Sequence, residues 1–357
     1  MSPPVETRIA LAVLPAGSDQ AGHPQYWLER RPDSTHLGGM LAFPGGKCQP
    51  DESPKDALAR ELHEELGILP QESRLLMEIP WVYLTKSNDL EGKQKSKHLR
   101  LMVYQVEKWQ GELHGREGQS VTPQTLDCNR QSEWMSALPP ANRGIVAALC
   151  LPSRIAITAA CGAGDVGFSV WHQALVKTVN ALRQKFGARS SIVQLRPGRD
   201  LSMAQWTAAV ATVQSMGLSA WVNADLDIAF ACRADGVHLN RYRLASEDRE
   251  ALTDWRAENR WVSASGQTLE EVRLANEVGV DALLISPILP TLSHPGEPGI
   301  GWVQFAKLTH EATMPTYALG GMLETHLPQV QMLAGQAFEK NCQEIFRKWM
   351  NSGKYTS

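Results

Sequence analysis

A short acidic helix with a leucine stripe is the feature that most restricts how this chain can fold. Ser53, followed by a proline, predicts the N-cap and the first turn of a helix. Leu58, Leu62 and Leu66 recur every four residues, which predicts one buried face. Gly67 follows the last leucine, in the position where glycine commonly ends a helix. The segment therefore predicts an amphipathic helix whose leucines anchor it to a core.

Three glutamates on this helix, Glu61, Glu64 and Glu65, are three and four residues apart and therefore share a face. Like charges in that arrangement repel each other, and a hard divalent cation between them removes the cost. Carboxylate oxygens are ligands that Mg²⁺ prefers, and Mg²⁺ commonly bridges to substrate phosphates. A solvated acidic helix face is the alternative. It leaves unexplained the preceding Gly45-Gly46 turn, which lets a backbone carbonyl approach the same metal.

The helix lies within a longer motif, because residues 46–68 read G-x5-E-x7-R-E-L-x-E-E-x-G-I. This pattern resembles the complete Nudix box. The resemblance implies an α/β/α sandwich and hydrolysis of a nucleoside diphosphate linked to another group, with Mg²⁺ as the cofactor and Mn²⁺ as the alternative ion. The helix residues that it implies for the metal site are Glu61, Glu64 and Glu65. Arg60 and Glu52 support that site, and the Gly45 carbonyl is an additional ligand.

Further segments resemble the MutT branch of this family, the 8-oxo-dGTP diphosphatases. They are Arg30-Arg31, Phe43–Lys47, Val106–Glu112, Gly115–Gln119 and Pro139–Asn142. By this resemblance Glu117 is another carboxylate of the metal site, and Asn142 reads the base through an amide that both donates and accepts. Arg31 contacts phosphate, and Phe43 lies at the base pocket. Ala42 departs from the pattern, since these proteins usually carry Glu or a similar residue there.

The reaction that the resemblance implies is attack at the β-phosphorus, which releases a nucleoside monophosphate and pyrophosphate. Divalent cations neutralise the charge that develops on the phosphoryl oxygens. Glu61 or Glu117 is expected to orient the attacking water, while Glu64 and Glu65 hold metal. The expected function is therefore 8-oxo-dGTP hydrolysis, which sanitises the nucleotide pool and avoids replication errors.

The N-terminal part reads as a mixed α/β domain. Strands are expected at Thr7–Leu14, Tyr26–Arg30 and Leu99–Val106, and residues 36–46 are expected to form a glycine-rich loop. After Leu151 short apolar runs alternate with helical segments, which is typical of a parallel sheet with helical crossovers. The runs lie at 154–158, 192–195, 220–223, 236–239, 261–263, 282–286 and 316–320. The pattern predicts a (β/α)₈ barrel, and two domains at residues 1–150 and 152–357.

The second domain resembles the thiamine-phosphate synthase and TenI family. The matching segments are Gln194–Arg196, Asn223, Ala234–Leu239, Ser286–Thr291 and Ala318–Met322. They lie at predicted carboxyl ends of strands, where barrel active sites are built. The residues expected to bind a phosphate or another ligand are Arg196, Asn223, Ser263, Thr291, Gly320 and Gly321.

Several departures from that family fall on its catalytic positions. Ala224 and Arg243 stand where the family has metal-binding carboxylates, and His294 replaces a lysine. These losses predict that the barrel is degenerate as a thiamine-phosphate synthase. Two alternatives remain open: a bifunctional protein of thiamine metabolism, and a barrel that senses a phosphorylated ligand and modulates the hydrolase. Residues 336–350 read as an amphipathic helix with no eighth strand before it.

Composition restricts the partners. The 35 basic and 38 acidic residues give a net charge of −3, so no basic field predicts stable nucleic-acid binding, and a small nucleotide is the expected substrate. No run of about 18 apolar residues predicts a membrane span, and no signal peptide is evident. The six cysteines are scattered and are expected to be free thiols in a reducing cytoplasm.

Overall fold

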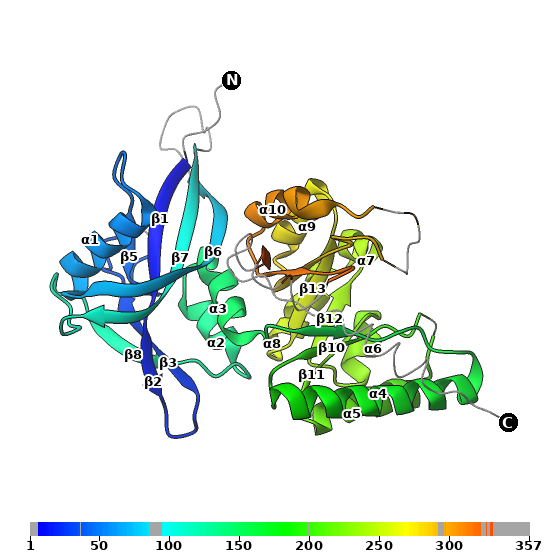
Figure 1. The fold of residues 1–357 in the computed structure, drawn as a ribbon. Helices are drawn as coiled ribbons and strands as arrows, with labels where there is room; N and C mark the ends of the chain where they lie inside the picture. Colours follow the sequence, from blue (N-terminus) through cyan, green and yellow to red (C-terminus); the bar gives the residue numbers. More distant parts are fainter. Residues whose placement is uncertain are drawn as a thin grey trace. The chain divides into compact units, whose positions relative to one another are not determined.

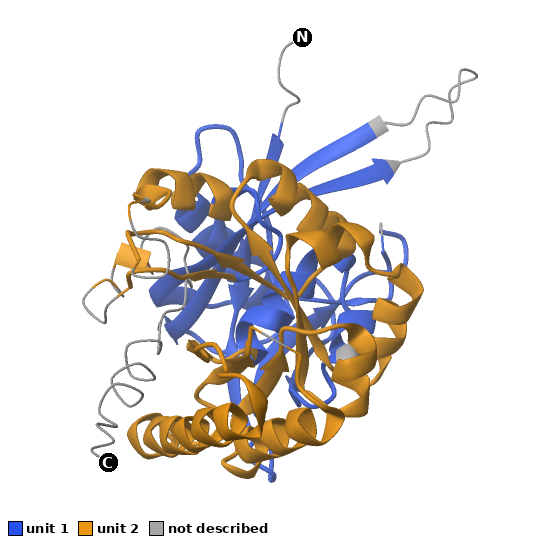
Figure 2. Ribbon diagram, turned by 90° about the vertical axis from the view of Figure 1, so that its right-hand side faces the viewer, with its two compact units in different colours: residues 1–150, 310–315, 334–336 blue, residues 151–309, 316–333, 337–357 orange. Residues whose placement is uncertain are grey.

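Two units make up the fold (Figure 2). The computed structural model describes residues 6–35, 37–85, 95–198, 200–291, 296, 298–322, 326 and 329–330. Unit 1 comprises the described residues up to Cys150 together with His310–Pro315. Unit 2 comprises Leu151–Thr309 and the described residues from Thr316 onward.

Unit 1 contains two sheets (Figure 1). The first has the strand order β5-β1-β7-β6, with strands at Gly45–Lys47, Glu6–Val13, Lys95–Gln110 and Leu69–Thr85. In the second, β3 is central and pairs with β2, β4 and β8; these strands lie at Pro24–Arg30, Pro15–Ser18, Leu41–Ala42 and Val121–Thr125. The loop expected at residues 36–46 is therefore partly wrong. Residues 41–42 and 45–47 pair as short strands, because neighbouring strands offer partners that the local sequence does not reveal.

Helix α1 (Pro54–Leu66) begins and ends as the sequence predicts. The Ser53 side chain accepts a hydrogen bond from the backbone N–H of Asp56, and Gly67 adopts the left-handed conformation with φ 72°. The helix buries Leu58, Leu62 and Leu66. Its glutamates lie away from that buried face, with Glu64 exposed and Glu61 and Glu65 partly buried.

Strand β1 divides unit 1 into two cores, because successive side chains point to opposite faces of a sheet. Ala10, Ala12 and Leu14 pack with the leucines of α1. Leu11 and Val13 face the other way, toward α2 (Gln131–Ala137) and α3 (Arg143–Cys150). Helices thus cover both faces of the first sheet, which confirms the expected α/β/α layering (Figure 1).

A disulfide joins Cys128, which precedes α2, to Cys150 at the end of α3, with a Cα–Cα distance of 5.3 Å. The expectation of six free thiols is therefore wrong for this pair. Cys150 lies 22 positions after Cys128 in the sequence, and the α2–α3 connection brings the two cysteines together. Cys48, Cys161 and Cys232 are free, and Cys342 lies outside the described residues.

Unit 2 is an all-parallel sheet in the order β9 to β15, with helices on its outer side (Figure 1). The strands in the described part of the chain are Ile155–Ile157, Ile192–Leu195, Ser219–Val222, Gly236–Leu239, Trp261–Gly266, Ala282–Ile285 and Thr316–Ala318. The helices α4 to α10 lie at Gly164–Phe186, Met203–Ser215, Leu226–Ala231, Arg241–Ser246, Arg249–Ala257, Leu269–Val278 and Gly301–His310. This succession confirms the expected barrel-type fold.

The predicted terminal helix at 336–350 and the closure of the barrel lie outside the described residues. Within the described ranges, no helix combines the length and the apolar character that crossing a bilayer requires.

Candidate active site

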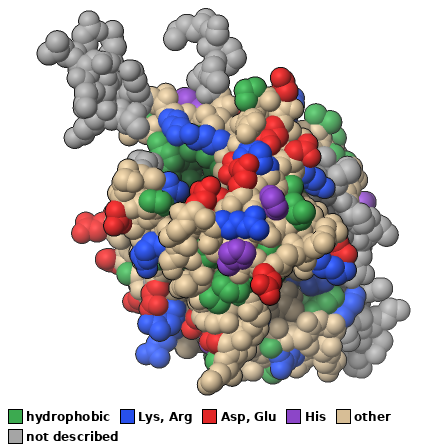
Figure 3. Space-filling view, turned by 90° about the vertical axis from the view of Figure 1, so that its left-hand side faces the viewer, with side chains coloured by type: hydrophobic (Ala, Val, Ile, Leu, Met, Phe, Trp, Pro, Cys, Tyr) green, Lys and Arg blue, Asp and Glu red, His purple; other side chains and the backbone are tan. Residues whose placement is uncertain are grey.

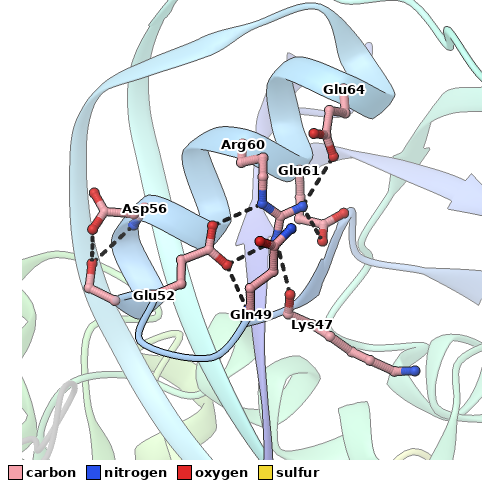
Figure 4. A network of polar contacts seen from close by, with 8 residues as sticks. Lys47, Gln49, Glu52, Asp56, Arg60, Glu61 and Glu64 are labelled. Atoms are coloured by element: carbon pink, nitrogen blue, oxygen red, sulfur yellow. Dashed lines mark hydrogen bonds and ion pairs between the residues drawn. The ribbon is translucent and has the colours of Figure 1, made fainter.

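Arg60 organises the carboxylates along the accessible side of α1 (Figure 4). Its guanidinium donates two hydrogen bonds to Glu52, of 2.9 and 3.0 Å. Its Nη1 donates to Glu61 at 2.8 Å and to Glu64 at 3.1 Å, and its Nη2 donates to the Lys47 carbonyl at 3.1 Å. The hydrogen bonds to Glu52 are the largest cause of a raised pKa at Arg60 and of a lowered pKa at Glu52. One cation therefore compensates three of the glutamates in the motif.

The glycines of β5 allow the strand to approach those carboxylates closely. A Cβ at Gly46 would overlap the Glu61 carboxylate. Gly45 has φ 132°, a Cβ there would overlap the Ala10 carbonyl oxygen, and its N–H donates to Glu65 at 3.3 Å. The glycine turn therefore lies against both Glu61 and Glu65, and the role expected for the Gly45 carbonyl as a metal ligand stays a prediction.

Glu65 is in a different electrostatic environment from Glu52. Burial, followed by the charges of Glu29 and Glu61, raises the pKa of Glu65 to about 8. The pKa of Glu29 is raised to about 7, chiefly by burial and also by Glu117 and Glu61. The sequence reading did not single out Glu29, which lies on β3, far from the motif along the chain.

The loop after β7 is fastened to the end of α1, and this brings Glu117 to the site. The Arg116 N–H and the Gln119 side chain both donate to the Glu65 carbonyl, at 2.8 and 3.2 Å. The Glu117 N–H donates to the Gln119 side chain at 2.9 Å. Glu117 is exposed and contributes to the electrostatic field at both Glu29 and Glu65.

The carboxylates fit a divalent cation in their chemistry, although they do not converge as a preformed cluster. Among the described residues, no three acidic, His or Cys side chains come close enough to form one. Mutual repulsion and the pull of Arg60 on Glu61 and Glu64 account for the spread. Burial and neighbouring negative charges make the ionised forms of Glu29 and Glu65 unfavourable in the free protein.

A cavity of about 420 Å³ adjoins the glycine turn, and it contains the residues expected to bind the nucleotide. Those that line it include Arg31, Phe43, Asn142, Gly45, Gly46 and Glu29. Asn142 is 5% exposed and lies in the 3₁₀ turn Pro140–Asn142. Lys47 and Lys97 also line it, and the sequence reading assigned a role to neither. Figure 3 shows a hollow in this unit with hydrophobic side chains inside and charged side chains at its rim.

In unit 2 the predicted residues occur at or just after strands. Arg196 follows β10, Asn223 follows β11, and Thr291 lies beyond β14. Gly320 and Gly321 follow β15 with φ of 89° and 69°, and each lies against the segment Pro287–Pro290.

Two residues in unit 2 that were not among the expected ligand-binding residues form hydrogen bonds to residues that were. Arg243 donates to the Asn223 side chain at 3.0 Å and to Asp225 at 2.6 Å. His238 is hydrogen-bonded through Nδ1 to the Ser263 hydroxyl at 3.0 Å and through Nε2 to that of Ser265. Burial, reinforced by nearby arginine charges, lowers the pKa of His238 to about 3.

Comparisons with known proteins match each half of the chain. A NUDIX domain model matches residues 7–137, and a model for thiamine monophosphate synthase matches residues 169–337. The 8-oxo-dGTP diphosphatase of Escherichia coli is 34% identical over 132 residues, 35% of this chain and 85% of that protein. Its counterpart in Haemophilus influenzae is 33% identical over 125 residues, 34% of this chain and 79% of that protein.

The barrel half matches over shorter stretches. A putative thiamine-phosphate synthase of Aquifex aeolicus is 34% identical over 101 residues, 28% of this chain, and the match spans about half (52%) of that protein. The solved thiamine phosphate pyrophosphorylase from Pyrococcus furiosus covers 60% of this chain and 98% of its own, with 18% identity and a TM-score of 0.40.

These findings define the protein as a hydrolase of pyrophosphate bonds: the chain belongs to the Nudix family. More particularly, the Nudix domain is followed by a second part, residues 169–337, that is similar to thiamine monophosphate synthase.

Proposed function

We propose that residues 1–150 act as an 8-oxo-dGTP diphosphatase, which releases the nucleoside monophosphate and pyrophosphate. One observation carries the proposal: a single cavity joins the buried amide of Asn142 and the ring of Phe43 to the Gly45-Gly46 turn beside the carboxylates. A base held at one end would direct its phosphates toward the other. The relatives named 8-oxo-dGTP diphosphatase support the same substrate.

The charges along the cavity suit a polyphosphate bound with a divalent cation. Arg31, Lys47 and Lys97 supply positive charge to phosphate oxygens. Bound Mg²⁺, or Mn²⁺ in its place, would neutralise the charge that develops on the phosphoryl oxygens. We assign its ligands to Gly45, Glu61, Glu64, Glu65 and Glu117. Glu61 and Glu117 are the two candidates for orienting the attacking water.

The test compares kcat/KM for 8-oxo-dGTP, dGTP and thiamine diphosphate in the full-length enzyme with saturating Mg²⁺. We expect a preference for 8-oxo-dGTP over dGTP, and Asn142→Ala should reduce that preference about 10- to 100-fold, the value of one buried hydrogen-bonded amide. Asn129→Ala, which removes an exposed amide in the same unit, serves as the control. Equal turnover of 8-oxo-dGTP and dGTP by the unaltered enzyme would disprove the sanitising role.

For residues 152–357 we propose binding of a phosphorylated ligand without thiamine-phosphate synthesis. Arg243 stands where the resemblance implies a metal carboxylate, and its guanidinium pairs with Asp225 and Asn223. A guanidinium at that point repels the Mg²⁺ that synthesis needs. Buried oxygens of Gln194 and Thr291 have no hydrogen-bond partner among the described residues, and a ligand would satisfy them.

Two measurements on the full-length chain separate this role from a bifunctional enzyme. Thermal melting with and without thiazole phosphate should show a stabilised transition, which Arg196→Ala abolishes. An assay for thiamine phosphate formation should show none. Formation of product would establish the bifunctional alternative, and the absence of any thermal shift would exclude the binding role.

A further inference from the structure

Glu29 on β3 lies directly opposite Ala42 on the neighbouring strand β4. Strands β3 and β4 are antiparallel, and their register pairs Glu29 with Ala42. Directly opposed residues on antiparallel strands point to the same face, with Cβ atoms about 4.5–5.5 Å apart. Both residues line the cavity that contains the glycine turn. A carboxylate on Glu29 can therefore occupy the space that a carboxylate at position 42 would reach.

Position 42 is where the sequence departs from the MutT-like pattern, which usually has a glutamate or a similar residue there. With Ala42, β4 has no carboxylate at this position, and Glu29 supplies one at the paired position of β3. Arg31, the first residue after the end of β3, also lines the cavity. The cavity therefore presents an acidic and a basic group to the same ligand.

The surroundings of Glu29 are those of the carboxylate site. Glu61 and Glu117 both act on its charge, and its own charge acts on Glu65. The Glu29 carboxylate is half-buried, and the positive charge that acts on it is that of Arg31 rather than that of Arg60, which binds Glu61 and Glu64.

We propose that Glu29 helps to hold the divalent cation of the hydrolase site, in place of the glutamate that is absent at position 42. The inference rests on the proposed function, since the cation is the one that accompanies the nucleotide. It adds a residue from outside the motif, carried into the site by strand pairing.

Binding of Mn²⁺ to the nucleotide-free, full-length protein tests the proposal directly, by electron paramagnetic resonance titration. Glu29→Gln preserves the shape of the side chain and removes its charge. We expect its dissociation constant for Mn²⁺ to rise at least 10-fold, the size of effect seen when a group that supports a metal site is lost. Glu72→Gln, at an exposed ion pair with Lys108 in the same unit, should bind as the unaltered protein does.

A double substitution tests the geometry. Glu29→Ala with Ala42→Glu returns the carboxylate to β4 and should restore Mn²⁺ binding to within about threefold of the unaltered protein. Glu29→Gln that binds Mn²⁺ normally, or a double variant that binds no better than Glu29→Gln, would overturn the proposal. Because these titrations use no nucleotide, they remain decisive even if 8-oxo-dGTP is not the substrate. Conversely, a failed Glu29 test leaves the measured substrate preference intact.

Discussion

Replacing Gly46 with alanine tests whether the site depends on the close approach of the glycine turn to Glu61. The backbone of Gly46 does not adopt a positive φ, so alanine is compatible with its conformation. The atoms nearest to the added Cβ belong to the carboxylate end of Glu61, which is a flexible side chain. We therefore expect the carboxylate to move and β5 to stay paired with β1.

The expected cost in stability is small. Displacing Glu61 breaks its 2.8 Å ion pair with Arg60, and this pair is worth about 1 kcal/mol after allowance for partial exposure. Replacing glycine by alanine reduces the conformational entropy of the unfolded chain, which stabilises the folded protein by about 0.4–1 kcal/mol. The two terms nearly cancel, so Tm should change by less than about 4 °C. Loss of a metal ligand costs about 3–4 kcal/mol of transition-state stabilisation, a decrease of 10²–10³ in kcat.

Gly45→Ala is the matched comparison, because we expect it to destabilise the protein through the backbone rather than to displace a side chain. Its φ of 132° and the overlap with the Ala10 carbonyl place the strain in the backbone. We expect a loss of about 3 kcal/mol and a Tm lower by about 6–12 °C. Melting curves and kcat at saturating Mg²⁺ separate the two variants. If Gly46→Ala keeps full kcat, the position of Glu61 against the glycine turn is not needed for hydrolysis.

Two further predictions concern stability. The pKa of His238 is about 3 in the folded state, below the usual 6.5, so the unfolded chain binds a proton at this residue more readily than the folded protein does. The free energy of unfolding is therefore highest above pH 6.5 and falls by about 2 kcal/mol at pH 5. His238→Gln should remove this loss in urea titrations at pH 5 and 7, and an unchanged pH dependence would contradict the assignment. Cys128→Ser should lower the free energy of unfolding by about 3 kcal/mol, from the 22-residue loop that the disulfide closes. Reductant should destabilise the unaltered protein to the same extent and leave the variant unaffected.

Local signals in the sequence were sufficient for α1 and for most of the barrel strands. The N-cap Ser53, the leucine stripe and Gly67 each act within a few residues, so their consequences can be read directly along the chain. The barrel strands are short, apolar and buried, and they alternate with helices, which makes them visible as a pattern. The motif likewise places its glutamates on one face without any tertiary information.

The features that the sequence did not reveal depend on pairing between distant segments. Glu29 belongs to the site through the register of β3 with β4, which no local pattern specifies. Arg243 comes into the barrel site through its hydrogen bonds to residues about 20 positions earlier in the chain. Cys128 and Cys150 meet because two helices intervene, and their spacing along the chain resembles no motif.

The site divides its carboxylates into two groups, and this division explains why the motif contains an arginine. Arg60 donates to Glu52, Glu61 and Glu64, which compensates these charges and holds the helix face together without a metal. Arg60 does not donate to Glu65 in this way, and burial, followed by the charge of Glu29, raises the pKa of Glu65. A charge that is costly in the free protein gains most when a cation binds, because binding removes both the repulsion and the unfavourable burial. The arginine thus preserves the fold of an acidic helix, while the carboxylates that it does not bind favour binding of the cation.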